Sequence, residues 1–264
     1  MSEVDHLSDC VTLARPQAHV ALVTIERAEA RNAVSVAVVQ GLARAVDMTE
    51  SDVDTWVTVI TGAGGKAFCA GADLKDVAAG RIMSLRTERG GFAGFTHRVR
   101  DKPWIAAVEG FAVGGGFEIA LACDLIVASE GSVFGLPEPK RGLIAAAGGV
   151  YRLPRALPRH LALELIATGA DLPAARAHDF GLVNRLVRPG EAVAAALVLA
   201  SSICACAPVA VYESLKIARL AADFDDPTLK QMTVEATERN SQTGDYKEGP
   251  RAFLEKRPPK WTGR

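Results

Sequence analysis

Two glycine-rich stretches, each tied to acidic residues, carry the strongest chemical signal in this sequence. The first reads FCAGADLK at residues 68–75, and the second reads GGGFE at residues 114–118, followed by the pair PE at residues 137–138. Glycine and alanine leave the backbone open, so main-chain N–H groups from two such stretches can converge on one small anion. Glu118 and Glu138 beside that anion would supply general acid and general base chemistry. The combination predicts an enzyme that stabilises an oxyanion.

Each of these residues also has an ordinary structural interpretation. Three consecutive glycines at residues 114–116 are typical of a tight turn between a strand and a helix. Glu118 in the first turn of a helix would be favoured by the helix dipole, and Asp73 is a suitable N-cap. Glu138 lies between two prolines and is most simply an exposed charge on a stiff loop. No single motif is therefore specific when it is taken alone.

Nucleotide-binding loops receive little support. The run GAGGK at residues 62–66 lacks the Ser or Thr that follows the lysine of a phosphate-binding loop, and its glycine spacing is different. No GxGxxG motif opens a helix after a strand. The glycine clusters are therefore better interpreted through the oxyanion chemistry above.

The elements that would position these residues alternate between strands and helices. Apolar and β-branched runs predict buried strands, and an N-cap at Ser35 with helical periodicity predicts the first helix. The expected strands span residues 19–25, 56–61, 105–108, 125–128 and 182–187. The expected helices span residues 35–48, 82–100, 160–168 and 174–180, with a short one from the glycine cluster through residue 123. Such alternation with short breaks predicts an α/β fold.

From about residue 191 the strand signals disappear. Helical segments follow, with breaks at Pro208, Pro227 and Gly244. We therefore divide the chain into a core over residues 1–200 and a helical C-terminal region over residues 201–264. A unit of about 65 residues is too small to bury much surface alone, so it should pack on the core or on another subunit.

The composition describes a chain with a large core and balanced charge. Of the 264 residues, 49% are hydrophobic, and 30 basic residues stand against 31 acidic ones. This balance gives no overall attraction to nucleic acid or to acidic membranes. The polar N-terminus over residues 1–6 is unlike a signal peptide, and the longest apolar runs are too short to cross a bilayer. We expect a cytoplasmic protein without nucleic-acid or membrane partners.

The five cysteines form no CxxC pair and have no histidine at metal-ligand spacing. An odd, scattered set of this kind is typical of reduced thiols that pack as small apolar side chains. Cys204 and Cys206 form a pair that could bind a metal or oxidise, but helix packing is the simpler interpretation. The sequence therefore predicts no metal site.

Three linked motifs resemble those of the crotonase, or enoyl-CoA hydratase/isomerase, family. They are AFCAGADLK at residues 67–75, GGGFE at residues 114–118 and FGLPE at residues 134–138, in the order and spacing of the family. The C-terminal runs GPRAFLEKR at residues 249–257 and WTGR at residues 261–264 are similar to the branch that contains carnitinyl-CoA dehydratases. The resemblance implies a spiral of ββα units with a helical C-terminal trimerisation region, assembled as a trimer or a dimer of trimers.

The resemblance also implies a role for each motif. The main-chain N–H groups of Ala72 and Gly115 would form the oxyanion hole for the thioester carbonyl of an enoyl-CoA. Glu118 and Glu138 would be the catalytic pair that adds water across the 2,3 double bond, as in fatty acid β-oxidation. Glu118 would accept the proton of water, and Glu138 would help to deliver a proton to the α-carbon. Coenzyme A is part of the substrate, so no separate cofactor is implied.

By the same resemblance, the substrate would be bound by the two glycine-rich stretches and by basic residues facing the phosphates of coenzyme A, with the C-terminal tail reaching the adenine end. The implied binding residues are Arg27, Ala30, Ala70, Gly71, Ala72, Asp73, Lys75, Gly114, Gly115, Phe253 and Lys256. A solvated surface charge is the alternative for the basic residues among them. The segment AAAGG at residues 145–149 lacks the proline often found in straight-chain hydratases, which leaves the acyl preference open.

Three other functions compete with hydration of a simple enoyl-CoA. Isomerisation of an enoyl-CoA needs one glutamate to move a proton, whereas the pair favours addition or elimination of water. Dehydration of a polar β-hydroxyacyl-CoA, as the carnitinyl-CoA resemblance suggests, is the same chemistry on another substrate. An RNA-binding relative in the family uses a lysine-rich helix after the first strand. Here the helix over residues 35–48 has Arg44 as its only basic residue, so RNA binding is disfavoured.

A second group of basic residues lies between residues 81 and 102, interleaved with acidic ones. We expect it to form a solvated face of the helix over residues 82–100, with binding of coenzyme A phosphates as the alternative.

Overall fold

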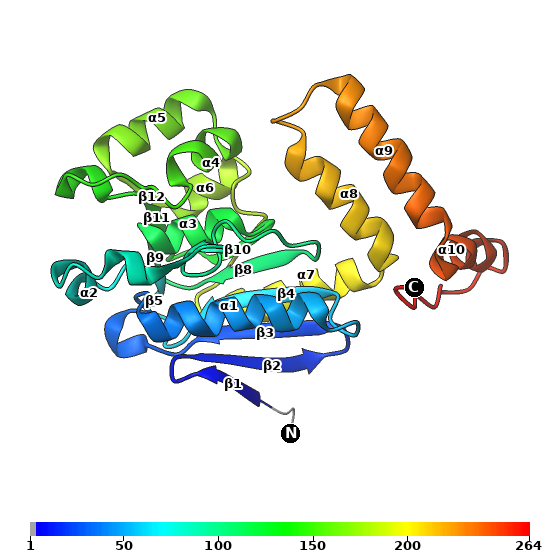
Figure 1. The fold of residues 1–264 in the computed structure, drawn as a ribbon, viewed down its shortest axis with the longest axis horizontal. Helices are drawn as coiled ribbons and strands as arrows, with labels where there is room; N and C mark the ends of the chain where they lie inside the picture. Colours follow the sequence, from blue (N-terminus) through cyan, green and yellow to red (C-terminus); the bar gives the residue numbers. More distant parts are fainter. Residues whose placement is uncertain (1–3) are drawn as a thin grey trace.

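A seven-stranded sheet forms the centre of the molecule in the computed structural model, which describes residues 4–264 (Figure 1). Residues 1–3, part of the polar N-terminal stretch discussed above, lie outside the described residues. The strand order is β1 (Val4–Ser8), β2 (Val11–Gln17), β3 (Val20–Ile25), β4 (Val57–Gly62), β8 (Trp104–Val108), β10 (Leu125–Ser129) and β13 (Arg185–Val187). The first three strands pair antiparallel, and the pairs from β3 to β13 are parallel. Parallel strands are covered on both faces, and every residue of β4 and β8 is accordingly buried.

A smaller sheet has the order β12 (Asp171–Pro173), β11 (Val133–Gly135), β9 (Phe111–Val113) and β5 (Ala67–Cys69). In the chain, β5 follows β4, β9 follows β8, and β11 follows β10, so each turn adds one strand to each sheet. The helices α2 (Leu74–Ala78), α3 (Gly115–Ala122) and α4 (Gly149–Ala156) follow these strands in turn. The result is a spiral of ββα units. Because β5, β9 and β11 are parallel neighbours, the loops that follow them meet at one edge of this sheet.

Helices cover both faces of the large sheet. On one face, α1 (Val36–Ser51) packs on β1, β2 and β3, and on the other α7 (Ala192–Cys204) packs on β4, β8 and β10. Ser35 is the N-cap of α1, where its side chain accepts a hydrogen bond from the Val38 N–H, as predicted. The predicted apolar face of α1 is also confirmed, because its members are all buried: Val38, Val39, Leu42, Ala45 and Val46.

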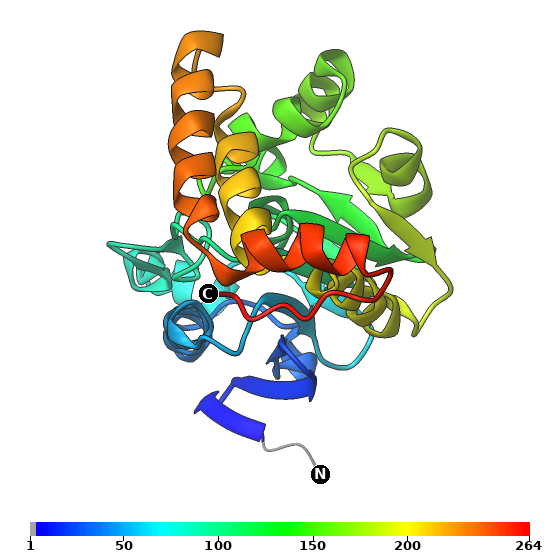
Figure 2. The ribbon, with the colours of Figure 1, turned by 90° about the vertical axis from the view of Figure 1, so that its right-hand side faces the viewer.

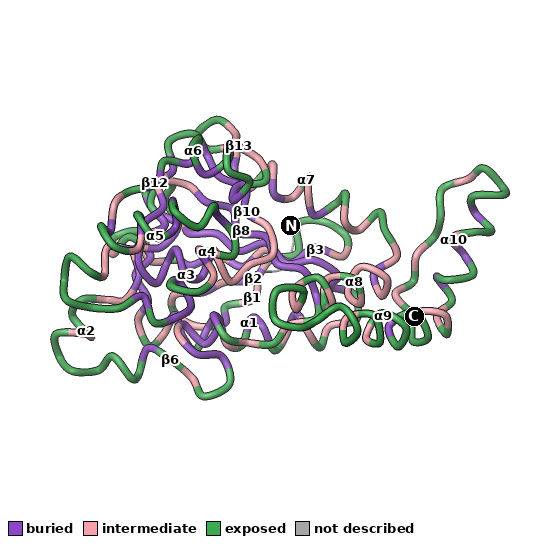
Figure 3. Tube along the Cα trace, turned by 90° about the horizontal axis from the view of Figure 1, so that it is seen from above, coloured by how far each residue is buried: buried purple, intermediate pink, exposed green. Residues whose placement is uncertain are grey.

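The chain ends in helices that extend away from the core (Figures 1 and 2). They are α8 (Pro208–Leu220), α9 (Asp226–Ser241) and α10 (Gly244–Leu254). Most residues of α9 and α10 are exposed, and most of those in α8 are intermediate in burial (Figure 3). Arg219 of α8 fastens them to the core through an ion pair with Asp124, in which Nε and Oδ1 are 2.7 Å apart. The division at residue 200 and the role of this region in trimerisation stay predictions.

The other predicted strands and helices are present with small shifts in their bounds. Strand signals at residues 19–25, 56–61, 105–108 and 125–128 correspond to β3, β4, β8 and β10, while β13 is shorter than the strand predicted at residues 182–187. The helices α5 (Arg159–Thr168) and α6 (Ala174–Asp179) match their predictions closely. The two N-terminal strands and the short strands β5, β9, β11 and β12 were not predicted.

The helix predicted over residues 82–100 is wrong. This stretch forms a 3₁₀ turn at Ile82–Leu85, a two-stranded hairpin of β6 (Arg86–Thr87) and β7 (Gly91–Phe92), and further turns. Gly91, Ala93 and Gly94 have φ values of 64°, 58° and 66°, a left-handed backbone that cannot continue an α-helix.

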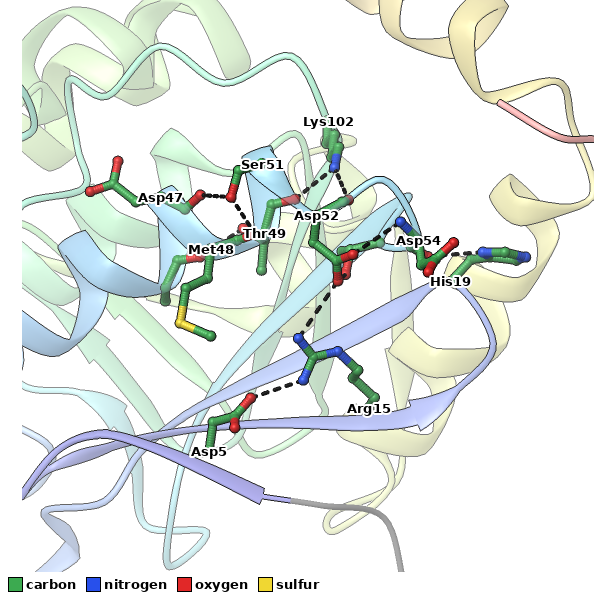
Figure 4. A network of polar contacts seen from close by, with 12 residues as sticks. Asp5, Arg15, His19, Asp47, Met48, Thr49, Ser51, Asp52, Asp54 and Lys102 are labelled. Atoms are coloured by element: carbon green, nitrogen blue, oxygen red, sulfur yellow. Dashed lines mark hydrogen bonds and ion pairs between the residues drawn. The ribbon is translucent and has the colours of Figure 1, made fainter. Parts of the chain in front are cut away.

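The basic residues in this stretch therefore do not share one helix face. Arg81 pairs with Asp76, and Arg98 pairs with Asp47. Lys102 is buried, and its Nζ donates to the carbonyl oxygens of Thr49 and Asp52, 2.7 and 2.6 Å away, at the end of α1 (Figure 4). Figure 4 also shows Arg15 between Asp5 and Asp52, at N–O distances of 2.9 and 3.6 Å.

Within residues 4–264, no single helix has the length and hydropathy needed to cross a membrane. The helices α7 and α8 meet that criterion only as a pair, and they are bent by 107° at their junction.

Candidate active site

A cleft of about 720 Å³ opens where the loops after β5, β9 and β11 meet. It is lined by both glycine-rich stretches, by both glutamates of the predicted pair and by the loop that follows β3. The predicted site residues that line it are Arg27, Ala30, Ala70, Gly71, Ala72, Asp73, Lys75, Gly114, Gly115, Glu118 and Glu138. The fold thus brings together residues that are separated by up to 111 positions in the sequence, from Arg27 to Glu138.

The two glycine-rich stretches touch each other at Gly71. A Cβ atom at this position would lie 3.0 Å from the Gly115 nitrogen and 3.1 Å from the Val113 carbonyl oxygen. Gly71 also has a φ of 86°, which an L side chain rarely adopts. Glycine is therefore required here for two independent reasons, and it allows the loops after β5 and β9 to approach closely.

Two residues that line the cleft, Ala72 and Gly115, have main-chain N–H groups without an acceptor among residues 4–264. Ala72 forms a parallel bridge with Val34, in which Val34 N–H donates to Gly71 O and Asp73 N–H donates to Val34 O. This pattern points the N–H of Ala72 away from Val34. Gly115 is the first residue of α3, where helical N–H groups have no intrahelical partner. Among the hydrogen bonds of residues 4–264, neither N–H donates to the protein, so both can bind an oxyanion.

Glu118 is buried on α3, with 3% of its surface exposed. Its Oε1 accepts a hydrogen bond from the Gly149 N–H at 2.9 Å. Burial raises the pKa of Glu118 to about 7, and the negative charge of Glu138 acts in the same direction. The N–H groups of Gly149 and Ala147 and the charge of Arg152 oppose this rise in pKa. A carboxyl group with a pKa near neutrality can both accept and donate a proton.

Glu138 begins the 3₁₀ turn Glu138–Arg141 and is half-buried, so its interpretation as an exposed loop charge is wrong. Burial raises its pKa, and the charge of Arg141 opposes the rise. Its Oε1 would lie 3.1 Å from a Cβ atom at Gly114, which places the carboxyl group beside the turn before α3. Its Oε2 is buried and accepts no hydrogen bond from residues 4–264. A buried carboxyl oxygen of this kind needs a further donor to be stabilised.

Asp73 joins two loops of the cleft. As predicted, it caps α2, because Oδ1 accepts the Lys75 N–H at 2.9 Å. Its Oδ2 lies 3.0 Å from Nη2 of Arg27, and Nη1 of Arg27 donates to Ala33 O at 2.7 Å. The Lys75 N–H and Arg27 together lower the pKa of Asp73. Arg27 is thus already paired with a carboxylate, whereas Lys75 forms no ion pair within the described residues.

Sequence reasoning missed Asn32, which supports the same loop. Asn32 is fully buried with a φ of 55°, a left-handed conformation in which Asn is enriched. Its Nδ2 donates to the carbonyl oxygens of Ala63 and Ala67 at 2.9 and 2.7 Å, and its Oδ1 accepts the Arg27 N–H at 2.9 Å. No composition or periodicity signal marked this residue, because its contacts come from segments distant in sequence.

Apolar side chains line the rest of the cleft, and the sequence indicated only the segment at residues 145–149 among them. They are Leu74, Val77, Ile82, Met83, Phe92, Val113, Leu143, Ile144, Ala146 and Ala147. Three further basic residues, Arg31, Arg86 and Arg141, also line the cleft. Arg31 ends the basic stretch that begins at Arg27, and Arg86 belongs to the group at residues 81–102 for which phosphate binding was the alternative, whereas Arg141 was not predicted. No group of three or more His, Cys, Asp or Glu side chains within residues 4–264 could hold a metal ion.

Two predicted binding residues do not line the cleft of this chain. Phe253, 83% exposed, lies on α10, and Lys256 follows that helix. Figure 1 shows α10 at the opposite end of the molecule from α2 and β5. Their contact with substrate stays a prediction that requires a second subunit or a different placement of the C-terminal helices.

Comparison with known proteins agrees with this geometry. The chain from residue 15 to residue 264 matches the family model described as enoyl-CoA hydratase/isomerase. The carnitinyl-CoA dehydratase of Salmonella typhi is 39% identical over 255 residues, which cover 92% of this chain and 94% of that protein. The spiral α/β fold of ββα units defines the class, and the chain belongs to the enoyl-CoA hydratase/isomerase family.

Solved structures of relatives support the same conclusion. An enoyl-CoA hydratase from Mycobacterium tuberculosis H37Rv superposes with a TM-score of 0.92 at 45% identity, covering 96% of this chain and 99% of that one. A carnitinyl-CoA hydratase from Mycobacterium avium has a TM-score of 0.76 at 46% identity, covering 97% and 99% of the two chains. The predicted crotonase-type spiral is thereby confirmed.

Proposed function

We propose that this protein is an enoyl-CoA hydratase, which adds water across the 2,3 double bond of an enoyl-CoA and reversibly dehydrates the 3-hydroxyacyl-CoA. The observation that carries this proposal is the presence in one cleft of the Ala72 and Gly115 N–H groups, the buried Glu118 and the half-buried Glu138. Membership of the enoyl-CoA hydratase/isomerase family supports it.

The oxyanion hole would activate the substrate. The thioester carbonyl would accept hydrogen bonds from Ala72 and Gly115, which draw electron density from the conjugated double bond towards the carbonyl oxygen. The β-carbon becomes electron-poor, and the enolate-like charge that develops on the oxygen is stabilised by donors already in place. Loss of one such donor typically lowers the rate by about 10²–10³.

The two glutamates would handle the protons. The water oxygen bonds to the β-carbon while one of its protons passes to the Glu118 carboxylate, and the protonated Glu138 gives its proton to the α-carbon. The product gains one H and one OH, and a proton moves from Glu118 to Glu138 to restore the pair. Raised pKa values suit this exchange, because burial favours the protonated form of both carboxyl groups. The unsatisfied Oε2 of Glu138 supports the presence of a water donor there.

Double-bond isomerisation is the weaker alternative. A shift of the double bond requires one proton carrier, and the second glutamate would then lie in the cleft without a role. Removing a carboxyl group from water is costly, and two partly or fully buried glutamates in one cleft therefore favour addition and elimination of water, which uses both.

A polar acyl-CoA is the second candidate substrate. The curated relatives at 39% identity are named carnitinyl-CoA dehydratases, and they match over nearly the whole chain. The apolar lining at Met83, Phe92 and Ile144 instead favours a simple aliphatic acyl group. Arg86 and Arg141 in the same cleft would repel a trimethylammonium group. We therefore place short aliphatic enoyl-CoA first.

The test is hydration of crotonyl-CoA by the purified protein, followed as loss of the conjugated enoyl-thioester absorbance. The trimethylammonium-bearing enoyl-CoA that dehydration of carnitinyl-CoA yields is measured in parallel. Faster turnover of crotonyl-CoA, lost in Glu118→Gln and Glu138→Gln, is the expected result. Turnover of the trimethylammonium substrate alone would reverse the substrate assignment, and turnover of neither would refute the proposed function.

Assembly, location and cofactor requirement form the rest of the proposal. Exposed apolar side chains on and beside the C-terminal helices, such as Phe224 and Val234, support a homo-oligomer, a trimer or a dimer of trimers, which light scattering would measure. We propose a cytoplasmic enzyme. All proposed steps use groups of the chain itself, so hydration is expected to need no cofactor and to continue at the same rate in the presence of a chelator.

A further inference from the structure

Arg152 connects two loops beside the cleft. It lies on α4, and its guanidinium group donates from Nη2 to Thr96 O at 2.6 Å and from Nη1 to Ala147 O at 3.0 Å. The group lies directly over Gly148, where a Cβ atom would be 2.0 Å from Nη1. Only glycine allows this approach. Arg152 thus ties the segment at residues 147–149 to the loop that ends at Thr96.

The segment at residues 147–149 is also the one that holds Glu118. Gly149 donates its N–H to Glu118 Oε1 at 2.9 Å, and the N–H of Ala147 acts on the same carboxyl group. Ala147 therefore presents its carbonyl to Arg152 and its N–H towards Glu118. Movement of this segment would change the hydrogen bonds that Glu118 receives.

The charge of Arg152 has no carboxylate partner among the described residues, and its guanidinium carbon lies 5.2 Å from the centre of the Tyr151 ring. Within the described residues it forms no ion pair, although it is half-buried and both its hydrogen bonds go to neutral carbonyls. Burial lowers its pKa, and Glu118 is the carboxylate whose charge opposes that change. Placing a cation away from water without a carboxylate contact is costly. A half-buried cation without a carboxylate partner is expected where its charge or its hydrogen bonds serve a neighbouring functional group.

We propose that Arg152 is a positioning residue that holds the segment at residues 147–149 against Glu118, so that the Glu118 carboxylate keeps the hydrogen bond from Gly149 that stabilises its charge. The proposal rests on the proposed function, in which ionised Glu118 accepts the proton of water. It concerns a residue outside the cleft lining, and it assigns to Arg152 a part in setting the pH range in which the hydratase works.

Several titratable groups lie near Arg152 and Glu118, and their effects on the pH profile must be distinguished from that of Arg152. Glu138 faces Glu118 from the 3₁₀ turn, and Tyr151, Arg155 and Cys123 surround Arg152. His97 lies between Thr96 and Tyr151: its Nδ1 is 3.1 Å from Thr96 Oγ1, and its Nε2 is 2.9 Å from Tyr151 Oη. After burial, the charge of Arg152 is the next cause that lowers the pKa of His97, and Arg86 adds to it. A histidine control is therefore needed.

The first experiment is the pH profile of kcat/KM for crotonyl-CoA. In Arg152→Met the acidic limb is expected to move to higher pH by about 0.5–1 unit, because an opposite charge near a carboxyl group lowers its pKa by an amount of this order or more. Arg152→Lys, which keeps the charge, should move it less. A loss of kcat/KM that is equal at every pH would show a purely structural role and overturn the proposal.

Two matched controls accompany these variants. Arg155→Met removes a neighbouring cation of α4 that pairs with Asp223, and it should leave the limb in place. His97→Gln removes the histidine and should also leave it in place. A shift in His97→Gln equal to that in Arg152→Met would assign the limb to His97 and overturn the proposal.

A second experiment needs no turnover. The difference in unfolding free energy between the wild type and Glu118→Gln, measured against pH, reports the titration of Glu118. The comparison is then repeated with Arg152→Met added to the wild type and to the Glu118→Gln variant. The pH range over which the two unfolding free energies diverge should move to higher pH, and an unchanged range would overturn the proposal. Arg152→Gln replaces Met if the latter does not fold. If the wild type hydrates no enoyl-CoA, the proposed function fails and this experiment alone decides the role of Arg152.

Discussion

Replacing Glu118 by Gln should inactivate the enzyme and at the same time stabilise it at alkaline pH. The pKa of Glu118 rises from an ordinary value of 4.5 to about 7, chiefly through burial. Between these two values the folded chain holds a proton that the unfolded chain has released, so stability falls as the pH rises through this window. Above it, the ionised side chain costs about 3 kcal/mol of folding free energy.

Gln removes this cost because it never ionises, and its Oε1 can still accept the Gly149 N–H. It also removes the repulsion between Glu118 and Glu138. We therefore expect Glu118→Gln to match the wild type near pH 4.5 and to exceed it by up to about 3 kcal/mol at pH 8. Hydration of crotonyl-CoA should fall by at least about 10².

Urea unfolding at several pH values between 4.5 and 8, at one fixed protein concentration, measures this difference. The concentration is fixed because the stability of an oligomer depends on it. Glu164→Gln is the matched control, since it changes an exposed glutamate on α5 and should give no pH-dependent difference. A Glu118→Gln difference that is the same at all pH values would show that the pKa of Glu118 is not raised in the folded chain.

Three further predictions concern the cleft. Glu138→Gln should reduce kcat by about 10²–10⁴ with little change in KM, because it removes one proton carrier; an unchanged kcat would contradict the two-glutamate mechanism. Gly71→Ala should lower both kcat and the thermal midpoint, since its Cβ would meet the Gly115 nitrogen at 3.0 Å and its φ is 86°; full activity would show that the two loops need not touch. A double-mutant cycle of Arg27→Met and Asp73→Asn should give a coupling energy of about 1 kcal/mol, and additive effects would show that the ion pair does not hold the loops together.

The residues that the structure gathers in one cleft could be picked out from the sequence because they occur in ordered local motifs, and their catalytic roles stay predictions. The glycine clusters, Glu118 and Glu138 all line one cleft. The caps at Ser35 and Asp73 were predictable for a similar reason, since a capping side chain bonds to an N–H two or three residues away. Long apolar runs identified β3, β4, β8 and β10. A strand that is buried on both faces consists of consecutive apolar residues, and this pattern is visible in the local sequence.

The stretch at residues 82–100 was mispredicted because its basic and apolar residues have a spacing compatible with a helix. Its conformation is decided instead by left-handed residues such as Ala93, with a φ of 58°. The strands β5, β9 and β11 were missed because three residues are too few to show a period. Their existence depends on pairing with one another across the turns of the spiral.

The sequence by itself determined which groups are available for chemistry: two glutamates, open backbone at two glycine clusters, and the family to which the chain belongs. Only the tertiary structure decided what those groups can do. The pKa of Glu118 is about 7 because the surrounding chain excludes water. The hydrogen bond that its carboxyl group accepts comes from the N–H of Gly149, 31 residues away in the sequence. Glu138 is half-buried rather than exposed, because the folded chain packs around part of its side chain. Solvent exclusion and electrostatic interaction depend on distances in space, and the spiral sets those distances by making β5, β9 and β11 neighbours.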